Sequence, residues 1–313
     1  MSKQILLVEP RGFCAGVERS IKILDWVVEK AKTQVYVRHQ IIHNNRVIED
    51  YEKKGVKFVE SLDEVPNGSI VVMSAHGTAP EIINVAKRRQ MKVIDAVCPL
   101  VTKVHMEAKR LADDGYFVIY IGHKGHQEAI GVLGEVPVNR SVLIEGVDEI
   151  DKWKRPKDAK KIGVVTQTTL HADESLEMVN RLKQRFPDLK LPLGGDICYA
   201  TKGRQGAVME LARRVDIVLV VGSKTSSNSN KLKDRAEEQG VKSYLVDDKK
   251  LVKKEWFEGV ENVGITAGAS GPDYLIQEVV EKVEELFGGE VRELVVGRDE
   301  VKFGNLPEGL RLL

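Results

Sequence analysis

The chemistry of this chain is concentrated first in its three cysteines, Cys14, Cys98 and Cys198. Apolar runs typical of buried strands, residues 5–8 and 93–97, precede the first two, Asp196-Ile197 leads to the third, and each cysteine comes just before a predicted helix. Any one of them alone could be a buried inert thiol, and a disulfide framework would need an even and denser set. Since the same strand–cysteine–helix frame occurs at all three, the sequence predicts that three thiolates meet at one point.

Three thiolates suit two kinds of metal site. A structural zinc ion uses four protein ligands, usually with close pairs of cysteines, and no such pair occurs in this chain. A catalytic zinc ion can use three protein ligands and a water molecule. An iron–sulfur cube is ordinarily held by four cysteines, so three would leave one iron open to a substrate oxygen. The spacing favours the cluster and leaves the zinc site open as the alternative.

Polar side chains that could bind an anion follow other predicted strands, at or just before the starts of helices. Helix N-termini present free N–H groups and the positive end of the helix dipole, which suits phosphate. Hydroxyl, amide and imidazole groups add further donors, although any single Ser, Thr or Asn there could be only a helix cap. Taken together, the loops predict a site for a diphosphate-sized anion. The residues concerned are His43, His76, Thr168, Ser226, Asn228 and Ser270.

The segment His126-Gln127-Glu128 is the strongest candidate for a proton source. A carboxyl group close to a histidine, near a metal, can be tuned for general acid catalysis. The alternative is that Glu128 only stabilises the N-terminal end of a helix dipole. The other histidines, His39, His105, His123 and His171, have weaker claims, and we expect His105 to be a packed or surface residue of the helix after Cys98.

The elements that must position these residues alternate between strand and helix along almost the whole chain. Two loops, residues 75–81 and 267–273, share small residues, a hydroxyl group, a proline and an acid. The sequence therefore predicts an α/β protein with three small lobes around a pseudo-threefold axis, with the site at the carboxyl ends of the strands. The predicted lobes are residues 1–97 with the N-terminal strand and Cys14, 98–195 with Cys98 and 196–288 with Cys198, followed by a C-terminal strap, 289–313.

The composition excludes several classes of partner. The 313 residues include 42% apolar and 30% charged residues, an ordinary globular balance, and 48 basic against 47 acidic residues leave no sign of a nucleic-acid-binding surface. The apolar run near the N-terminus is too short for a signal peptide or a membrane span, so we expect a cytoplasmic protein without a membrane partner. Neither a Walker loop nor G-x-G-x-x-G occurs, which argues against an ordinary nucleotide site.

Six short motifs follow one another along the chain, at residues 11–17, 98–105, 122–126, 166–169, 198–201 and 226–230. As an ordered set they resemble the motifs of the 4-hydroxy-3-methylbut-2-enyl diphosphate reductase family, and the resemblance spans about residues 11–270. Three residues depart from the family pattern: Gln127 stands where the family has Pro, and Gly203 and Thr225 stand where it has Asn. None of the three is a functional position, so the departures concern only local loop shape.

The resemblance implies a three-lobed α/β trefoil around an oxygen-sensitive [4Fe–4S] cluster. It also implies a reductive dehydroxylation, the last step of the non-mevalonate isoprenoid pathway. Two electrons and protons remove the allylic hydroxyl of 4-hydroxy-3-methylbut-2-enyl diphosphate as water and give isopentenyl and dimethylallyl diphosphate. By motif match, the three cysteines hold the cluster, and Glu128 with His126 and Thr168 manages protons. The diphosphate residues implied are His43, His76, His126, Thr168, Ser226, Ser227, Asn228 and Ser270.

The source of electrons must lie outside the chain, which has no flavin or nicotinamide fingerprint. The resemblance implies a ferredoxin or a flavodoxin that carries NADPH-derived electrons. Two other functions remain open on the sequence. One is a zinc hydrolase with three cysteine ligands that acts on a phosphorylated substrate. The other is a non-catalytic redox sensor that uses a cluster and an anion pocket to signal.

Overall fold

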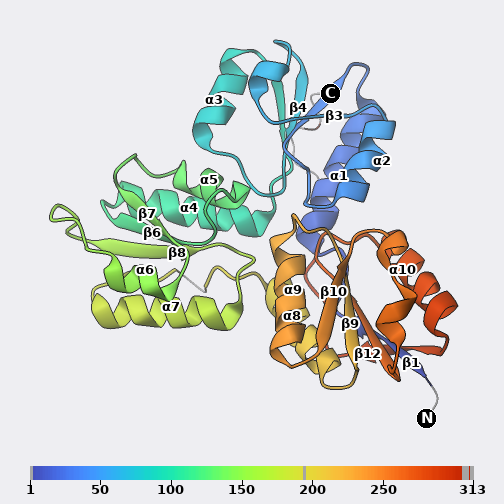
Figure 1. Ribbon diagram of the computed structural model, residues 1–313. Helices are drawn as coiled ribbons and strands as arrows, with labels where there is room; N and C mark the ends of the chain where they lie inside the picture. Colours follow the sequence, from blue (N-terminus) through green and yellow to red (C-terminus); the bar gives the residue numbers. More distant parts are fainter. Residues whose placement is uncertain (1–2, 193–194, 305–309, 311–313) are drawn as a thin grey trace. The chain divides into compact units, whose positions relative to one another are not determined.

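The computed structural model describes residues 3–192, 195–304 and 310, and its strands form three parallel sheets (Figure 1). The chain divides into two compact units. One unit contains a sheet built from both ends of the chain, and the other contains two sheets. The three parallel-sheet lobes predicted from the sequence are therefore confirmed. Among the described residues, no helix is both long and apolar enough to cross a membrane.

The first unit comprises residues 3–18, 42–53 and 199–304 and contains a five-stranded parallel sheet in the order β10-β9-β11-β1-β12. The strands are β1 (Gln4–Glu9), β9 (Ile217–Val221), β10 (Lys242–Val246), β11 (Asn262–Ala267) and β12 (Glu290–Val295). The helices are α2 (Asn45–Lys53), α8 (Tyr199–Ala212), α9 (Ser227–Glu238) and α10 (Asp273–Phe287), with 3-10 turns η2 (Lys249–Leu251) and η3 (Lys254–Phe257).

Two hydrophobic clusters cover the two faces of this sheet. On one face, residues such as Ile5 and Leu219 pack against α10. On the other face, Val8 and Val218 pack against α8 and α9. Figure 1 shows these helices on opposite sides of the strands. Because both faces are covered, the inner strands β1, β9 and β11 are largely apolar, as in other parallel sheets, whereas the edge strands β10 and β12 carry polar residues.

The N-terminal strand corrects the predicted lobe assignment. This strand is predicted to belong to the lobe of residues 1–97, but β1 pairs with β11 and β12. Ile5 and Leu7 belong to the cluster on one face and Val8 to that on the other. The strand therefore needs apolar cover on both sides, which the five-stranded sheet supplies.

The C-terminal segment 289–313, predicted as a strap, begins with a strand. All six residues of β12 are in parallel register with β1, from Gln4 opposite Glu290 to Glu9 opposite Val295. Residues 305–309 and 311–313 of the predicted strap lie outside the described residues. The other proposed lobe bounds, 98–195 and 196–288, stay predictions.

The second unit comprises residues 19–41, 54–192 and 195–198 of the described chain and contains two parallel sheets. The first has the order β3-β2-β4-β5, with β2 (Val35–Arg38), β3 (Lys57–Val59), β4 (Ile70–Met73) and β5 (Lys92–Asp95). The second has the order β7-β6-β8, with β6 (Phe117–Ile121), β7 (Ser141–Ile144) and β8 (Ile162–Thr166). The helical elements are η1 (Leu62–Glu64), α3 (Pro80–Arg88), α4 (Pro99–Asp113), α5 (Gln127–Leu133), α6 (Val147–Lys152) and α7 (Ala172–Arg185), while α1 (Ala15–Lys30) continues here from the first unit.

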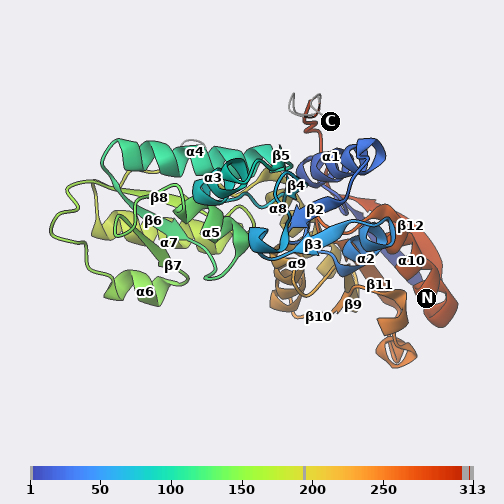
Figure 2. The same ribbon diagram turned by 90° about the horizontal axis from the view of Figure 1, so that it is seen from above.

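The three-stranded sheet is also covered on both faces. Val118, Tyr120 and Val165 pack with residues of α4 and α5. Ile119 and Val164 point to the opposite face, where they pack with residues of α6 and α7. Figure 2 shows α4 running along this sheet, and Figure 1 shows α6 and α7 on its other side. Beyond the carboxyl ends of β6 and β8, Glu128 lies in the first turn of α5 and Thr168 in the loop that follows β8.

Candidate functional site

Two of the three cysteines lie in the second unit, each next to the start of a helix. Cys98 is the N-cap of α4, and Cys198 directly precedes α8. The N–H of Cys98 donates to the carbonyl of Ala75 over 3.0 Å, and that of Cys198 donates to the carbonyl of Thr168 over 3.2 Å. Neither residue forms a disulfide, and both are half-buried. The main chain thus ties one cysteine to the loop of His76 and the other to the loop of Thr168.

Cys14 lies in the first unit, where its carbonyl accepts the first bond of α1 from the N–H of Glu18 over 2.9 Å. Gly12, two residues earlier, has a φ of +65°, and a Cβ there would lie 3.0 Å from Ile276. The carbonyl of Gly12 accepts two bonds, of 3.1 and 2.8 Å, from the fully buried guanidinium of Arg204. Arg204 also pairs with Asp299 over 2.7 Å. The turn that carries Cys14 is therefore anchored in the core by a buried cation.

His76 and His126 come together in the second unit. Their rings are 6.0 Å apart between centroids and meet edge to face at 89°. His126 is the N-cap of α5, and its Nδ1 accepts from the N–H of Glu128 over 3.1 Å. Since Nδ1 accepts, the proton of a neutral His126 ring is on Nε2, where it can donate to an anion.

Glu128 is the best-defined titratable group of the site. Its side chain is buried, and its two oxygens accept from the N–H and the hydroxyl of Thr168 over 2.7 and 2.8 Å. Burial raises the pKa of Glu128 to about 7, the bonds from Thr168 oppose that rise, and the nearby carboxylate of Asp196 adds to it. A carboxyl group with a pKa near neutrality can keep a proton and give it up in a reaction.

The first unit brings together the predicted residues from its own loops. Ser226 is the N-cap of α9, and the hydroxyls of Ser270 and Ser226 are bonded over 3.3 Å. Asn228 accepts from the N–H of Ala269 over 2.9 Å, and its Nδ2 has no hydrogen-bond partner in the part of the chain that the structure describes. A buried amide N–H₂ of this kind is available to an anion. Ser227 is the first residue of α9.

His43 is placed near these residues through its neighbour. Asn44 is fully buried and donates from its side chain to the carbonyl of Ser270 over 2.8 Å, while its own oxygen accepts from the N–H of Val47. The segment that carries His43 is therefore bound to the loop that carries Ser270. Each unit thus holds a part of the predicted site, assembled from loops at the ends of strands.

A family model for the LytB protein matches residues 5–284. The chain belongs to the LytB family. The 4-hydroxy-3-methylbut-2-enyl diphosphate reductase of Aeromonas salmonicida is 47% identical over 312 residues, which cover 99% of each chain. The protein of the same name from Vibrio parahaemolyticus is 45% identical over 312 residues, covering 99% of this chain and 98% of the relative.

Two solved structures of LytB relatives resemble this chain. The E-1-hydroxy-2-methyl-but-2-enyl-4-diphosphate reductase from Plasmodium falciparum matches with a TM-score of 0.95 and 35% identity, covering 100% of this chain and 98% of that one. A structure described as (E)-4-hydroxy-3-methyl-but-2-enyl diphosphate reductase, the terminal enzyme of the non-mevalonate pathway, matches with a TM-score of 0.65 and 33% identity, covering 90% and 99%. The chain therefore has the fold of an oxidoreductase family.

Membership of the LytB family implies a metal-cluster cofactor, and the cysteines of this chain fit such a group. Thiolates are the soft ligands that iron–sulfur clusters and zinc prefer. None of the three forms a disulfide and all are half-buried, so they are not enclosed in a dry core. Each lies next to a helix N-terminus, whose positive dipole end stabilises a thiolate.

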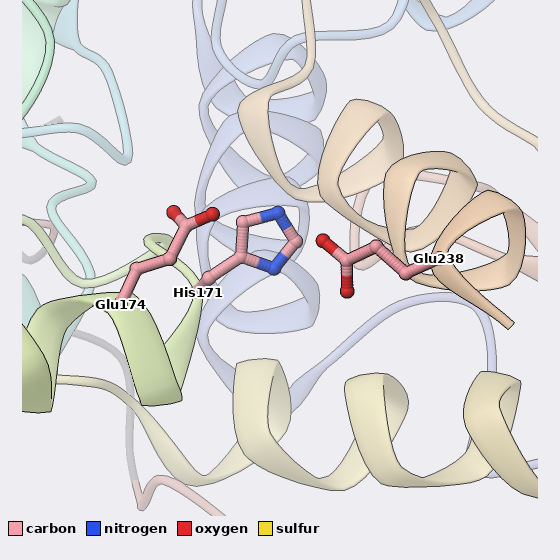
Figure 3. A group of neighbouring side chains, drawn as sticks. All are labelled: His171, Glu174 and Glu238. Carbon is pink, nitrogen blue, oxygen red and sulfur yellow. The ribbon is translucent and has the colours of Figure 1, made fainter.

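The remaining histidines have other local partners. His39 has a φ of +57°, and its Nδ1 lies 2.6 Å from a carboxylate oxygen of Glu60. Burial is the main cause that lowers the pKa of His39. His123 lies 3.8 Å from Glu145. His171 is the N-cap of α7, with Glu174 in the first turn after it (Figure 3). Glu238, also drawn there, ends α9 of the first unit and accepts from Arg235 over 2.8 Å.

Sequence reasoning missed two residues that hold the site in place. Arg204 and Asn44 are both fully buried polar side chains that donate to main-chain carbonyls far away in the sequence. Asn44 has a local signal, because a polar residue directly before a helix is a common cap. Arg204 has no such local signal, since an arginine within a helical pattern is ordinarily predicted to be exposed.

Proposed function

We propose that this chain reduces 4-hydroxy-3-methylbut-2-enyl diphosphate to isopentenyl and dimethylallyl diphosphate, the last step of the non-mevalonate pathway. The names and near-complete coverage of its relatives support this assignment. The observation that carries it within the chain is the buried pair of Glu128 and Thr168 beside His126. Removal of a hydroxyl group as water needs a proton donor, and Glu128 has a pKa suited to that role.

We propose that the cofactor is a [4Fe–4S] cluster held by Cys14, Cys98 and Cys198. The donor set supports it, because three thiolates leave one iron without a protein ligand. When bound, such a cluster supplies electrons and an open Lewis-acidic position for the substrate hydroxyl. The role of the chain is to hold the thiols at three helix starts, with the main chain of two of them bonded to site loops.

We propose that the diphosphate is bound by hydroxyl, amide and imidazole donors, none of which carries a fixed positive charge. His126 can donate from Nε2, and Asn228 from its amide nitrogen. The free N–H groups at the start of α9 add main-chain donors. The complete proposed set is His43, His76, His126, Thr168, Ser226, Ser227, Asn228 and Ser270.

Proton delivery is assigned to Glu128. In the overall reaction the C–O bond to the allylic hydroxyl breaks, and two electrons and two protons convert the alcohol into a C–H bond and water. The protonated carboxyl of Glu128 gives one proton to the departing oxygen, and the hydroxyl and N–H of Thr168 then stabilise the carboxylate that remains. His126, whose Nδ1 accepts from the N–H of Glu128, keeps the start of α5 in place for this transfer.

Electrons come from outside the chain, and we propose a ferredoxin or a flavodoxin supplied by NADPH, acting with this protein in the cytoplasm. An anaerobic preparation tests the whole assignment. We expect a brown protein with iron and acid-labile sulfide that turns over the allylic diphosphate with reduced viologen. Zinc without sulfide would favour a hydrolase, and an iron–sulfur protein that binds the substrate without turnover would favour a sensor. Either result would reject the proposal.

A further inference from the structure

His105 fills the space between two glycines of neighbouring elements. A Cβ atom at Gly77 would lie 2.3 Å from Nε2 of His105, and one at Gly131 would lie 3.0 Å from the same nitrogen. His105 is 8% exposed, and no described residue forms a hydrogen bond with its Nε2. The edge of the imidazole therefore occupies the volume that a side chain would need at either glycine.

A carboxylate fixes the orientation of this ring. Nδ1 of His105 lies 2.8 Å from Oε1 of Glu135, and the two side chains are 10% and 15% exposed. An ionised carboxylate only accepts, so Nδ1 donates to it and the opposite edge of the ring faces the glycines. Glu135 directly follows Gly134, the C-cap of α5, and His105 lies on α4. The pair thus joins α4 to the end of α5.

The two glycines belong to the elements that carry the paired histidines of the site. Gly77 follows His76 in a turn, has a φ of +85° and donates weakly to the carbonyl of Ser74 over 3.4 Å. Gly131 lies on α5, the helix capped by His126. The edge of His105 therefore packs against both the turn of His76 and the helix of His126 where the two approach each other, since a Cβ at Gly131 would also lie 3.3 Å from the carbonyl carbon of Gly77. The rings of His76 and His126 are 6.0 Å apart.

We infer that His105 and Glu135 are positioning residues that set the separation of His76 and His126 and thereby the affinity for the diphosphate group. The inference rests on the proposed function, in which both histidines bind that group. A hydrogen bond to a bound anion depends steeply on distance and direction. A shift of the His76 turn toward α5 therefore weakens binding, although neither His105 nor Glu135 contacts the substrate.

Two substitutions, tested in the anaerobic holoenzyme, separate the space-filling role of the His105 ring from the orienting role of Glu135. His105→Asn places an amide nitrogen near the Nδ1 position, so it keeps a donor for Glu135 but empties the space beside the glycines. Glu135→Gln keeps the size of the side chain and removes the charge that orients the ring. We expect each to raise KM for the allylic diphosphate by about tenfold through misplacement of the histidines, with kcat within about threefold of the wild-type value.

Two further variants calibrate the result. Met106→Ala, at the neighbouring and 67% exposed position of α4, should leave KM, kcat and iron content unchanged. His76→Ala tests the proposed function itself and should raise KM. If His76→Ala raises KM while Glu135→Gln and His105→Asn do not, the positioning role is wrong and the proposed function stands.

Other outcomes are equally decisive. An unchanged KM in His76→Ala would remove that histidine from the diphosphate site and overturn the inference with it. A fall in iron content or melting temperature at constant KM would reduce His105 to a purely structural residue. If His105→Asn does not fold, Glu135→Gln decides, because its change in size is negligible.

Discussion

Each unit of the molecule packs one side chain between two glycines, next to residues proposed to bind the diphosphate. In the first unit, Cβ atoms at Gly222 and Gly268 would lie 2.2 and 2.1 Å from the hydroxyl of Ser229. In the second unit, the corresponding side chain is His105, between Gly77 and Gly131. The contact of Ser229 joins α9 to the residues that directly follow β9 and β11. The contact of His105 joins α4 to the turn of Gly77 and to α5.

The two regions differ in the groups that surround this contact. Ser229 lies among hydroxyl and amide groups, those of Ser226, Asn228 and Ser270, which do not titrate near neutral pH. His105 is paired with a carboxylate and lies close to the elements that carry two histidines and Glu128, groups that exchange protons in that range. The first region therefore offers fixed dipoles to an anion, and the second adds groups whose charge changes. Substrate binding should therefore depend on both regions, whereas proton transfer should depend on the second region alone.

Among the tests of this difference between the two regions, Glu128→Gln should have the largest effect. The amide is nearly isosteric and can still bond with Thr168, but it cannot deliver a proton. We expect kcat to fall by about 10²–10⁴, the usual contribution of a general acid, while the dissociation constant of the substrate is roughly preserved. Steady-state kinetics and substrate titration of the reduced enzyme measure the two quantities. Activity within about threefold of wild type, well short of that range, would leave Glu128 with only a role at the helix dipole.

The matching test in the first region is Asn228→Asp. The carboxylate keeps the acceptor for the N–H of Ala269 but replaces the amide donor with a negative charge. We expect KM to rise by about 10–100-fold, the equivalent of one hydrogen bond to a charged group, with a smaller change in kcat. Asn228→Ser, which keeps a donor, should be milder. A large loss of kcat at constant KM would place proton chemistry in the region that we describe as fixed dipoles.

The packing of the two regions can be compared with Gly268→Ala and Gly131→Ala. At Gly268 the new methyl group meets a hydroxyl at 2.1 Å, so we expect a loss of about 1–3 kcal/mol in the free energy of unfolding, as for an overpacked core. Adding Ser229→Ala should recover part of it. At Gly131 the atoms nearest to a new Cβ would be 3.0 Å away, and alanine favours a helix more than glycine does. The free energy of unfolding should therefore change less in Gly131→Ala. Urea denaturation of both variants measures the difference, and equal losses would contradict it.

The smallest expected effect is a shift in the pH profile of Thr168→Val. Wild-type kcat should fall as pH rises through about 7, because Glu128 then loses the proton that it must donate. The hydroxyl of Thr168 stabilises the ionised form and lowers this pKa, so its removal should move the fall to higher pH. Ser270→Ala, in the other region, should leave the midpoint unchanged whatever it does to KM. A midpoint that moves to lower pH in Thr168→Val would reverse the assigned role of that hydroxyl.

Local patterns in the sequence could predict much of this organisation. Cys14 and Cys98 lie between a strand and a helix, and Cys98 is the N-cap of α4, as their flanking residues indicate. Cys198 also precedes a helix, but among the described residues the last element before it is α7 and not a strand. The capping position of Ser226 follows from the same short-range rules, and Glu128 as an acid in the first turn indicates the start of α5. These features depend on residues within one or two turns of each other, so a single sequence is sufficient to find them.

Other features depend on residues that meet only after folding. Nothing near β1 indicates that it pairs with strands more than 250 residues away, since Gln4 is opposite both Asn262 and Glu290. The strand β10 is also hard to find from the sequence, because its start, Lys242 and Ser243, is polar and only its later residues are apolar. Similarly, His105 has an ordinary helical setting, and its role depends on glycines of two other elements.

The place of β1 has a consequence for the order in which the protein is made. The strand leaves the ribosome before its neighbours β11 and β12, which follow it in the chain by more than 250 residues. At about 5–20 residues per second, the first strand waits roughly a quarter of a minute to a minute for its partners. During this time an apolar segment with unpaired edges is open to chaperones and proteases. The sheets of the second unit are complete much earlier, so the nascent chain has its second unit folded while the two ends of the first are still apart.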